Sequence, residues 1–121
     1  MNYEVTPLPN VMNTLLGENG CPWDEEQTHQ SLRKNLLEES HEVIEAIDSN
    51  DMEHLKEELG DLLLQIVFHA KLAEQSGAFN FNDVVEAVTS KMIRRHPHIF
   101  GDVKADNAEV VLSNWEAIKK Q

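Results

Sequence analysis

The sequence predicts an all-α protein, a helical bundle of about four to five helices. Apolar residues recur at helical spacing along most of the 121 residues, and strand signals are almost absent. The five glycines and four prolines cluster between these segments, as punctuation between helices does. We find no internal repeat, low-complexity tract or second domain, so we expect a single domain over residues 1–121.

The first two expected helices differ in length. A short helix from about Pro9 to Leu16 ends at Gly17, where the turn-like sequence GENGCPWD begins. A long helix follows from about Ser31 to Ile47 and carries apolar residues at helical spacing. These residues are Leu32, Leu36, Val43, Ile44 and Ile47.

The remaining elements are marked by their caps. The sequence Asp-Ser-Asn-Asp at 48–51 indicates a helix end followed by a new N-cap. We expect a second long helix from about Met52 to Gln75, closed by serine and glycine. The next helix is capped near Asn82 and stops before Pro97, because a proline disfavours helical backbone at the residue before it. After the loop HPHIFGD, the sequence AEVVLSNWEAIKK predicts a last short helix.

The chain is strongly acidic. It has 10 Lys and Arg against 22 Asp and Glu, a net charge of -12, which disfavours nucleic acid or an anionic membrane as a partner. Such a protein can still handle phosphates if metal cations bridge the two. The single cysteine, Cys21, excludes an intramolecular disulfide. No apolar run approaches the ~20 residues of a membrane span, and the first residues do not resemble a signal peptide. We therefore expect a soluble cytoplasmic protein.

Carboxylates are concentrated in one segment. Residues 38–61 contain ten carboxylates and only one Lys or Arg, Lys56. Like charges at helical spacing weaken a helix by a few tenths of a kcal/mol per pair, so a positive partner should offset the repulsion. The ten are Glu38, Glu39, Glu42, Glu45, Asp48, Asp51, Glu53, Glu57, Glu58 and Asp61.

Two pairs of these carboxylates can converge. Glu39 and Glu42 share a helical face, as do Glu58 and Asp61, and Glu38 lies near the first pair. The link between the two long helices is short, so the helices should be antiparallel and the two pairs should lie at similar heights. Four carboxylates at one level suit a hard divalent cation such as Mg²⁺ or Mn²⁺.

Other interpretations of this segment stay open. The carboxylates could form a solvated acidic face, although Asp61 leads directly into the apolar run LLLQIVF, and carboxylates at the edge of a buried helix need partners. A di-iron centre needs a Glu-x-x-His motif on two helices, which the second long helix lacks. Gly60 costs roughly 1 kcal/mol in a helix interior relative to alanine. It is either a tolerated glycine or one that lets another backbone, a side chain or a ligand come close.

The motifs resemble a known family. EESHE at 38–42 and ELGD at 58–61, separated by fifteen residues, resemble the EExxE…ExxD signature of the MazG-type all-α nucleoside triphosphate pyrophosphohydrolases. The resemblance covers nearly the whole chain, and it is closest to the N-terminal domain of the longer, two-domain MazG proteins. The other segments that carry it are NGCPWDEEQTH at 19–29, FNFNDV at 79–84, RRHPHIFGD at 94–102 and NWEAIK at 114–119.

The resemblance implies an activity and an assembly. It implies an interlocked homodimer, with a dimer of dimers left open, and Mg²⁺-dependent hydrolysis of a nucleoside triphosphate to the monophosphate and pyrophosphate, with metal-activated water attacking the α-phosphorus. Mn²⁺ is an alternative metal. Glu39, Glu42, Glu58 and Asp61 match the family's metal ligands. Glu38 matches a further acidic position, either an auxiliary ligand or the group that orients the attacking water.

Basic and aromatic residues supply candidate substrate contacts. Lys91, Arg94 and Arg95 resemble the family's triphosphate-binding KxxRR region and can share a helical face, although a basic last turn also complements the helix dipole. Lys56 is either a phosphate contact or a solvated lysine. Trp115 either stacks on the base or anchors the core. The competing class of protein is a non-enzymatic acidic helical module that binds metal or a protein partner.

Overall fold

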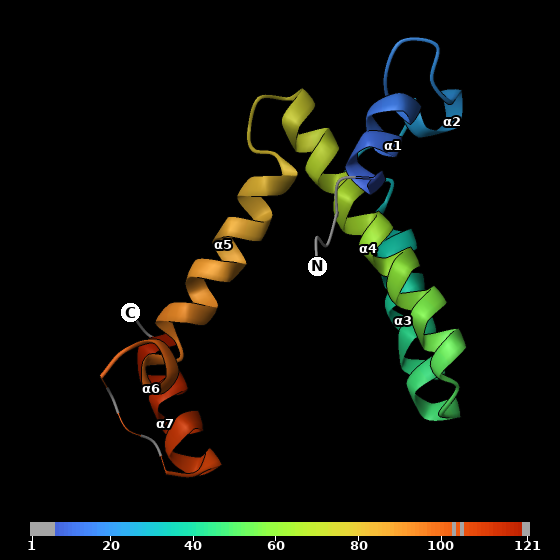
Figure 1. The fold of residues 1–121 in the computed structure, drawn as a ribbon. Coiled ribbons are helices and arrows are strands. Elements are labelled where there is room, and N and C mark those ends of the chain that lie inside the picture. The colour runs from blue at the N-terminus through green and yellow to red at the C-terminus, as the bar shows by residue number, and fades with distance from the viewer. Residues whose placement is uncertain (1–6, 103, 105, 120–121) are drawn as a thin grey trace. The chain divides into compact units, whose positions relative to one another are not determined.

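The described structure is entirely helical. The computed structural model describes residues 7–102, 104 and 106–119, and within these ranges it contains seven α-helices and no strand (Figure 1). This confirms the all-α class. The helices are α1 (Pro7–Leu15), α2 (Pro22–Glu25), α3 (Arg33–Ser49), α4 (Met52–Gln75), α5 (Phe81–Arg94), α6 (Pro97–Phe100) and α7 (Ala108–Lys119).

The number of helices exceeds the four to five expected because two helices of a single turn were missed. The helix α2 lies in the sequence GENGCPWD, expected to be a turn, and α6 lies in the HPHIFGD stretch, expected to be a loop. Each begins with a proline at its first helical position, Pro22 and Pro97. A proline there loses no hydrogen bond and already has a helical φ, so the chain can make one turn without a longer apolar pattern.

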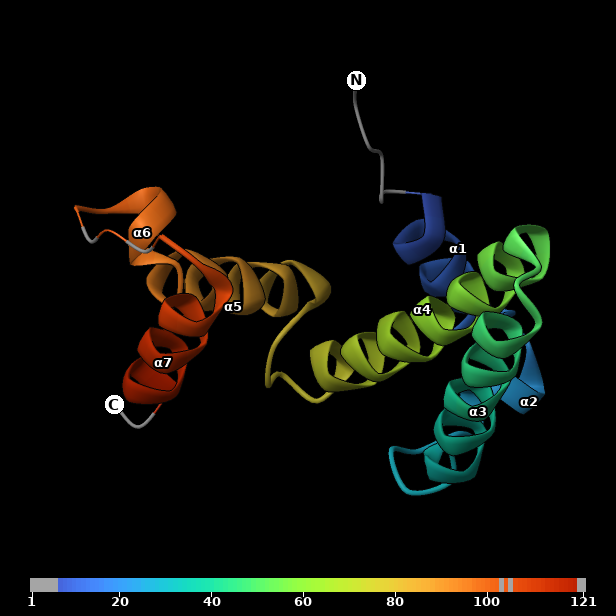
Figure 2. The same cartoon turned by 90° about the horizontal axis from the view of Figure 1, so that it is seen from below.

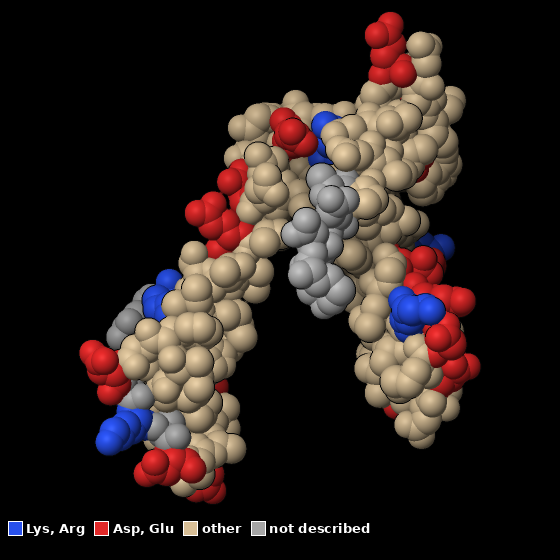
Figure 3. Space-filling view, in the orientation of Figure 1, with Lys and Arg blue, Asp and Glu red and all other residues tan. Residues whose placement is uncertain are grey.

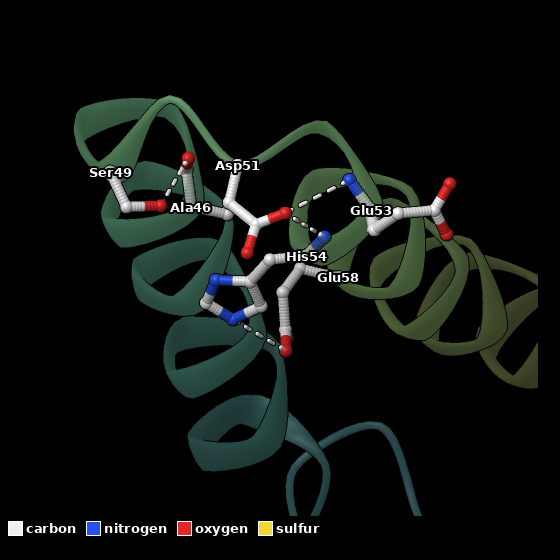
Figure 4. Close-up of polar contacts among 6 residues, drawn as sticks. All are labelled: Ala46, Ser49, Asp51, Glu53, His54 and Glu58. Atoms are coloured by element: carbon white, nitrogen blue, oxygen red, sulfur yellow. Dashed lines mark hydrogen bonds and ion pairs between the residues drawn. The ribbon is translucent and has the colours of Figure 1, made fainter.

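Local capping sets the boundary between α3 and α4, as the sequence predicted. Asn50 ends α3 with a left-handed backbone, at φ 56°. Asp51 then accepts hydrogen bonds from the backbone N–H groups of Glu53, at 3.1 Å, and His54, at 3.2 Å (Figure 4). These bonds satisfy two of the donors that a helix start leaves unpaired. The helix α4 runs over the residues predicted for it.

The chain divides into two compact units, one up to Phe81 and one from Asn82. In the first unit α3 and α4 lie side by side, and α1 packs on α4 (Figures 1 and 2). The buried core joins these helices and the segment that precedes α3. It consists of Met12, Leu16, Leu32, Val67 and Phe68.

A contact between two histidines joins the segment before α3 to α4. His29 and His69 stack with ring centroids 5.0 Å apart, and their Nδ1 atoms are 2.7 Å apart. One ring must donate the hydrogen and the other accept it, so both cannot be protonated at Nδ1. Burial lowers the pKa of His69, and the charge of His29 lowers it further.

Much of the apolar surface of the α3–α4 pair is exposed in the described part of the first unit. On α3, Val43 is buried, but Ile44 and Ile47 are 54% and 53% exposed. On α4, Val67 is buried while Leu63 is 38% exposed. The apolar periodicity therefore predicted both helices, although α3 begins and ends two residues later than the expected 31–47. Within the described residues, only part of each apolar face is used in the core. None of the helices in the described ranges is both long and apolar enough to cross a membrane.

Candidate metal centre

Three of the predicted carboxylates meet on the first unit. Glu39 comes from α3, and Glu58 and Asp61 come from successive turns of α4. One oxygen of each lies within 4.8 Å of the others. We call these three residues the carboxylate cluster. The cluster forms because the short link makes the two helices neighbours and because the i, i+3 spacing puts Glu58 and Asp61 on one face.

A second group adjoins the first. Glu42, His54 and Glu58 also each offer a ligand atom within 4.8 Å of the other two, and we call them the histidine cluster. Nε2 of His54 lies 3.3 Å from Oε1 of Glu58 (Figure 4). Glu58 belongs to both groups, and its side chain is only 14% exposed. His54 was not predicted as a site residue, although its i, i+4 spacing to Glu58 is visible in the sequence.

The negative charges affect one another. The pKa of Glu39 is raised, first because its carboxyl is partly desolvated and then because of nearby negative charges. Those charges, in decreasing order of effect, are Asp61, Glu58, Glu42 and Glu38. The carboxylates from the two helices therefore share one electrostatic environment, as metal ligands do before a cation binds.

The nearest lysines in the sequence are engaged outside the two clusters. Lys34 lies 3.9 Å from Glu38, and Lys56 lies 2.6 Å from Glu53. Glu38 therefore stands beside the carboxylate cluster but outside it. Figure 3 shows acidic side chains gathered over the α3–α4 pair with basic groups among them. The basic groups on this surface leave the clustered carboxylates available to a mobile cation.

The donor set fits a hard divalent cation. Carboxylate oxygens are the ligands that Mg²⁺ and Mn²⁺ prefer, and Mg²⁺ is commonly held by one or two carboxylates with several waters retained. Glu39, Glu58 and Asp61 supply such oxygens from two rigid helices. Because Asp61 is exposed, the site can also be reached by water and by a phosphate group.

The predicted substrate residues other than Lys56 lie in the second unit. Lys91 and Arg94 are exposed on α5. The guanidinium of Arg95 stacks over the ring of Trp115, 5.3 Å from its centroid, and His96 packs edge-on against the same ring at 5.2 Å. Trp115 thus makes the packing contacts of an anchor between α7 and the residues that link α5 to α6. Its alternative role in stacking on a base stays a prediction.

Fold and site together define a class of protein: an all-α protein with a cluster of carboxylates built on a helical hairpin. The chain belongs to the MazG nucleotide pyrophosphohydrolase domain family, whose family model matches residues 27–100. This confirms the resemblance found in the sequence.

Similar proteins cover nearly the whole chain. It is 50% identical over 119 residues to a nucleoside triphosphate pyrophosphohydrolase of Escherichia coli K12, and 49% identical over 118 residues to an uncharacterised protein, YabN, of Bacillus subtilis. These matches cover 98% of this chain but only 45% and 24% of the two relatives, so the chain spans less than half of their length. The crystal structure of a mazG-related protein from Thermotoga maritima matches with a TM-score of 0.79 and 29% identity, over 97% of this chain and all of that one.

Proposed function

We propose that this chain hydrolyses nucleoside triphosphates, with ribose or deoxyribose, to the monophosphate and pyrophosphate, using Mg²⁺ or Mn²⁺. Membership of the MazG family supports this reaction, as does the name of the relative from E. coli. The observation that carries the proposal is the carboxylate cluster, three carboxylate oxygens from two helices within 4.8 Å of one another.

Each acidic residue has a proposed role. Glu39, Glu58 and Asp61 hold the metal, with Glu42 completing the set from the neighbouring turn of α3. A bound metal would neutralise charge on the phosphates and lower the pKa of a water molecule, so that the water can lose a proton and attack the α-phosphorus. Glu38 serves as an auxiliary ligand or orients that water. Its contact with Lys34 is long, at 3.9 Å, and both side chains are more than half exposed, so it is free to turn.

The basic residues are proposed to bind the triphosphate. Lys91 and Arg94 are exposed and three residues apart on α5, so both can reach one phosphate chain. Lys56 would have to leave Glu53, which costs little because both side chains are at least 70% exposed. Arg95 and Trp115 are already stacked on each other, so together they would present one flat, cationic surface to the nucleotide.

We also propose that the chain works as a homodimer, which could pair again into a dimer of dimers. Exposed apolar residues follow helical spacing on both long helices, and a second copy would cover them better than water does. Sedimentation velocity should give the mass of two or four chains, and a single-chain mass would refute the assembly. The exposed apolar residues that a second copy would cover are Leu37, Ile44 and Ile47 on α3 and Leu59, Leu63 and Ile66 on α4.

A cytoplasmic location stays a prediction.

The activity can be tested directly. Purified protein is incubated with Mg²⁺ and each NTP and dNTP in turn, and the products are separated by anion-exchange chromatography. We expect the monophosphate and pyrophosphate in equal amounts. If no nucleotide yields pyrophosphate while the protein still binds Mg²⁺, the competing class of a non-enzymatic metal-binding module is correct.

The site assignment needs its own comparison. Glu42→Gln and Asp61→Asn should each abolish turnover, because each removes a charged ligand and keeps the side chain's size. Glu57→Gln is the matched control. It removes a carboxylate from the same helix, one that is exposed and belongs to neither cluster. Turnover that survives Asp61→Asn, or is lost equally in Glu57→Gln, would contradict the assignment.

A further inference from the structure

The histidine cluster has a different chemistry from the carboxylate cluster beside it. It combines one imidazole nitrogen with carboxylates from both helices, whereas Glu39, Glu58 and Asp61 offer oxygen alone. Mg²⁺ favours oxygen ligands, while Zn²⁺, Ni²⁺ and Co²⁺ accept imidazole readily. Two adjoining groups with different donors should therefore prefer different ions.

We propose that Glu42, His54 and Glu58 form a binding site for a divalent transition-metal ion of the Zn²⁺, Ni²⁺ or Co²⁺ type. The site adjoins the proposed Mg²⁺ site and shares Glu42 and Glu58 with it, so His54 is the ligand that distinguishes the two. The inference rests on the proposed assignment of Glu42 and Glu58 as metal ligands, but it does not require that the chain hydrolyse any nucleotide.

The geometry of the contact supports a shared ion. Nε2 of His54 and Oε1 of Glu58 are 3.3 Å apart. Two ligands held at 2.0–2.1 Å in a tetrahedral arrangement are separated by about 3.3 Å. Glu42 supplies a third atom from the facing helix, within 4.8 Å of both. The side chain of Glu42 is exposed, and a small rotation of it would bring all three ligand atoms to one ion.

The backbone holds His54 in place for this role. Its N–H donates to Asp51 at the N-cap, at 3.2 Å, which fixes the residue in the first turn of α4 (Figure 4). The next turn carries Glu58, and the spacing of four residues puts both side chains on one face. The side chain of His54 is 35% exposed, so it remains open to an ion from solvent.

A second histidine shows what the same pair looks like without a site. Nε2 of His41 lies 3.2 Å from Oε1 of Glu45, also at i, i+4, but the two side chains are 68% and 56% exposed. Among the described residues no third ligand joins them. The two pairs differ in the facing carboxylate of Glu42, which makes His41 a matched control for His54.

The test measures metal binding and not activity alone. Ni²⁺ and Mg²⁺ affinities are measured by titration calorimetry for the unaltered chain, His54→Ala, His54→Gln and His41→Ala, with helicity checked by circular dichroism. We expect both His54 variants to lose at least about tenfold in Ni²⁺ affinity, since even residues that only support a metal ligand cost 10–100-fold when removed. Mg²⁺ affinity should change less than twofold, and His41→Ala should change neither affinity.

A second readout identifies the ligand. Co²⁺ bound to the unaltered chain and to His41→Ala should give a visible d–d spectrum that both His54 variants weaken or shift. Three results would each overturn the proposal: Ni²⁺ affinity unchanged in the His54 variants, an equal loss of Mg²⁺ affinity, or an equal loss in His41→Ala. Unchanged Ni²⁺ affinity would mean that His54 and Glu58 form an ordinary helical ion pair. An equal loss of Mg²⁺ affinity would mean that His54 only positions Glu58, and an equal loss in His41→Ala would mean non-specific binding by surface histidines.

The fate of the proposed function is read separately in the same samples. If the unaltered chain binds Ni²⁺ through His54 but yields no pyrophosphate from any nucleotide with Mg²⁺, the hydrolase proposal fails and this site stands. If nucleotide is hydrolysed while the His54 variants bind Ni²⁺ unchanged, the reverse holds.

Discussion

Removing one charge from the carboxylate cluster should stabilise the metal-free protein. Two unit charges 4.8 Å apart repel by about 0.9 kcal/mol in water, and by about half of that at physiological salt, where the screening length is about 8 Å. The cluster contains three such pairs, and 4.8 Å is their largest separation. Asp61→Asn removes the two pairs that involve residue 61. We therefore expect the free energy of unfolding without metal to rise by about 1 kcal/mol at physiological salt.

The same substitution should remove most of the stabilisation by Mg²⁺. A ligand at 100 times its dissociation constant stabilises the folded state by about 2.7 kcal/mol. Urea denaturation is measured at one protein concentration, with chelator and with saturating Mg²⁺, for the unaltered chain, Asp61→Asn and Glu57→Gln. We expect Mg²⁺ to stabilise the unaltered chain and Glu57→Gln and to have little effect on Asp61→Asn. An Asp61→Asn protein that is less stable without metal, or that gains as much from Mg²⁺, would refute this electrostatic reasoning.

Three further predictions concern the fold of the first unit. A Cβ added at Gly60 would meet nothing within 4 Å. Gly60→Ala should therefore raise the free energy of unfolding by up to about 1 kcal/mol. A loss of stability in urea would show that a ligand or a second copy occupies that space. Phe68 is 3% exposed, so Phe68→Ala should cost about 3–5 kcal/mol by urea denaturation, and a cost below about 1 kcal/mol would contradict its place in the core. The pKa of His69 is lowered from 6.5, so near that pH the unfolded chain binds more protons than the folded chain. Stability should therefore be complete above pH 6.5 and fall as the pH drops below it. His69→Gln should flatten this pH dependence, while His41→Gln, at an exposed histidine, should keep it. Equal slopes in all three proteins would be evidence against the partly buried position of His69.

The parts of the fold that local sequence determines were predictable. The start of α4 and the turn before it followed from Asn50 and Asp51, which act within three residues of their own positions, and the end of α4 followed from the serine and glycine after it. The one-turn helices at Pro22 and Pro97 were missed because a single turn has no periodicity to detect. Their only signal was the proline itself, which is equally common in turns.

The site was predictable to the extent that it follows from helix geometry. The convergence of Glu39 with Glu58 and Asp61 required only the i, i+3 rule and a short antiparallel link. His54 was missed because its partner Glu42 lies on the other helix, and whether the two side chains face each other depends on how the two helices are rotated about their axes. The contact between residues 29 and 69 was likewise beyond reach, since it joins an irregular segment to a helix forty residues away.

The position of the carboxylate cluster explains how a folded protein can tolerate so many like charges close together. Asp61 and the buried Val67 are six residues apart on α4, about 9 Å along the helix axis. The core therefore holds the helix rigid while the carboxylate itself stays in water. Burying like charges would cost several kcal/mol for each ion, but at the exposed edge the repulsion among the three pairs costs only about 1.4 kcal/mol at physiological salt. That is less than the stabilisation expected from a bound cation, so the ligands can be preorganised before the metal arrives.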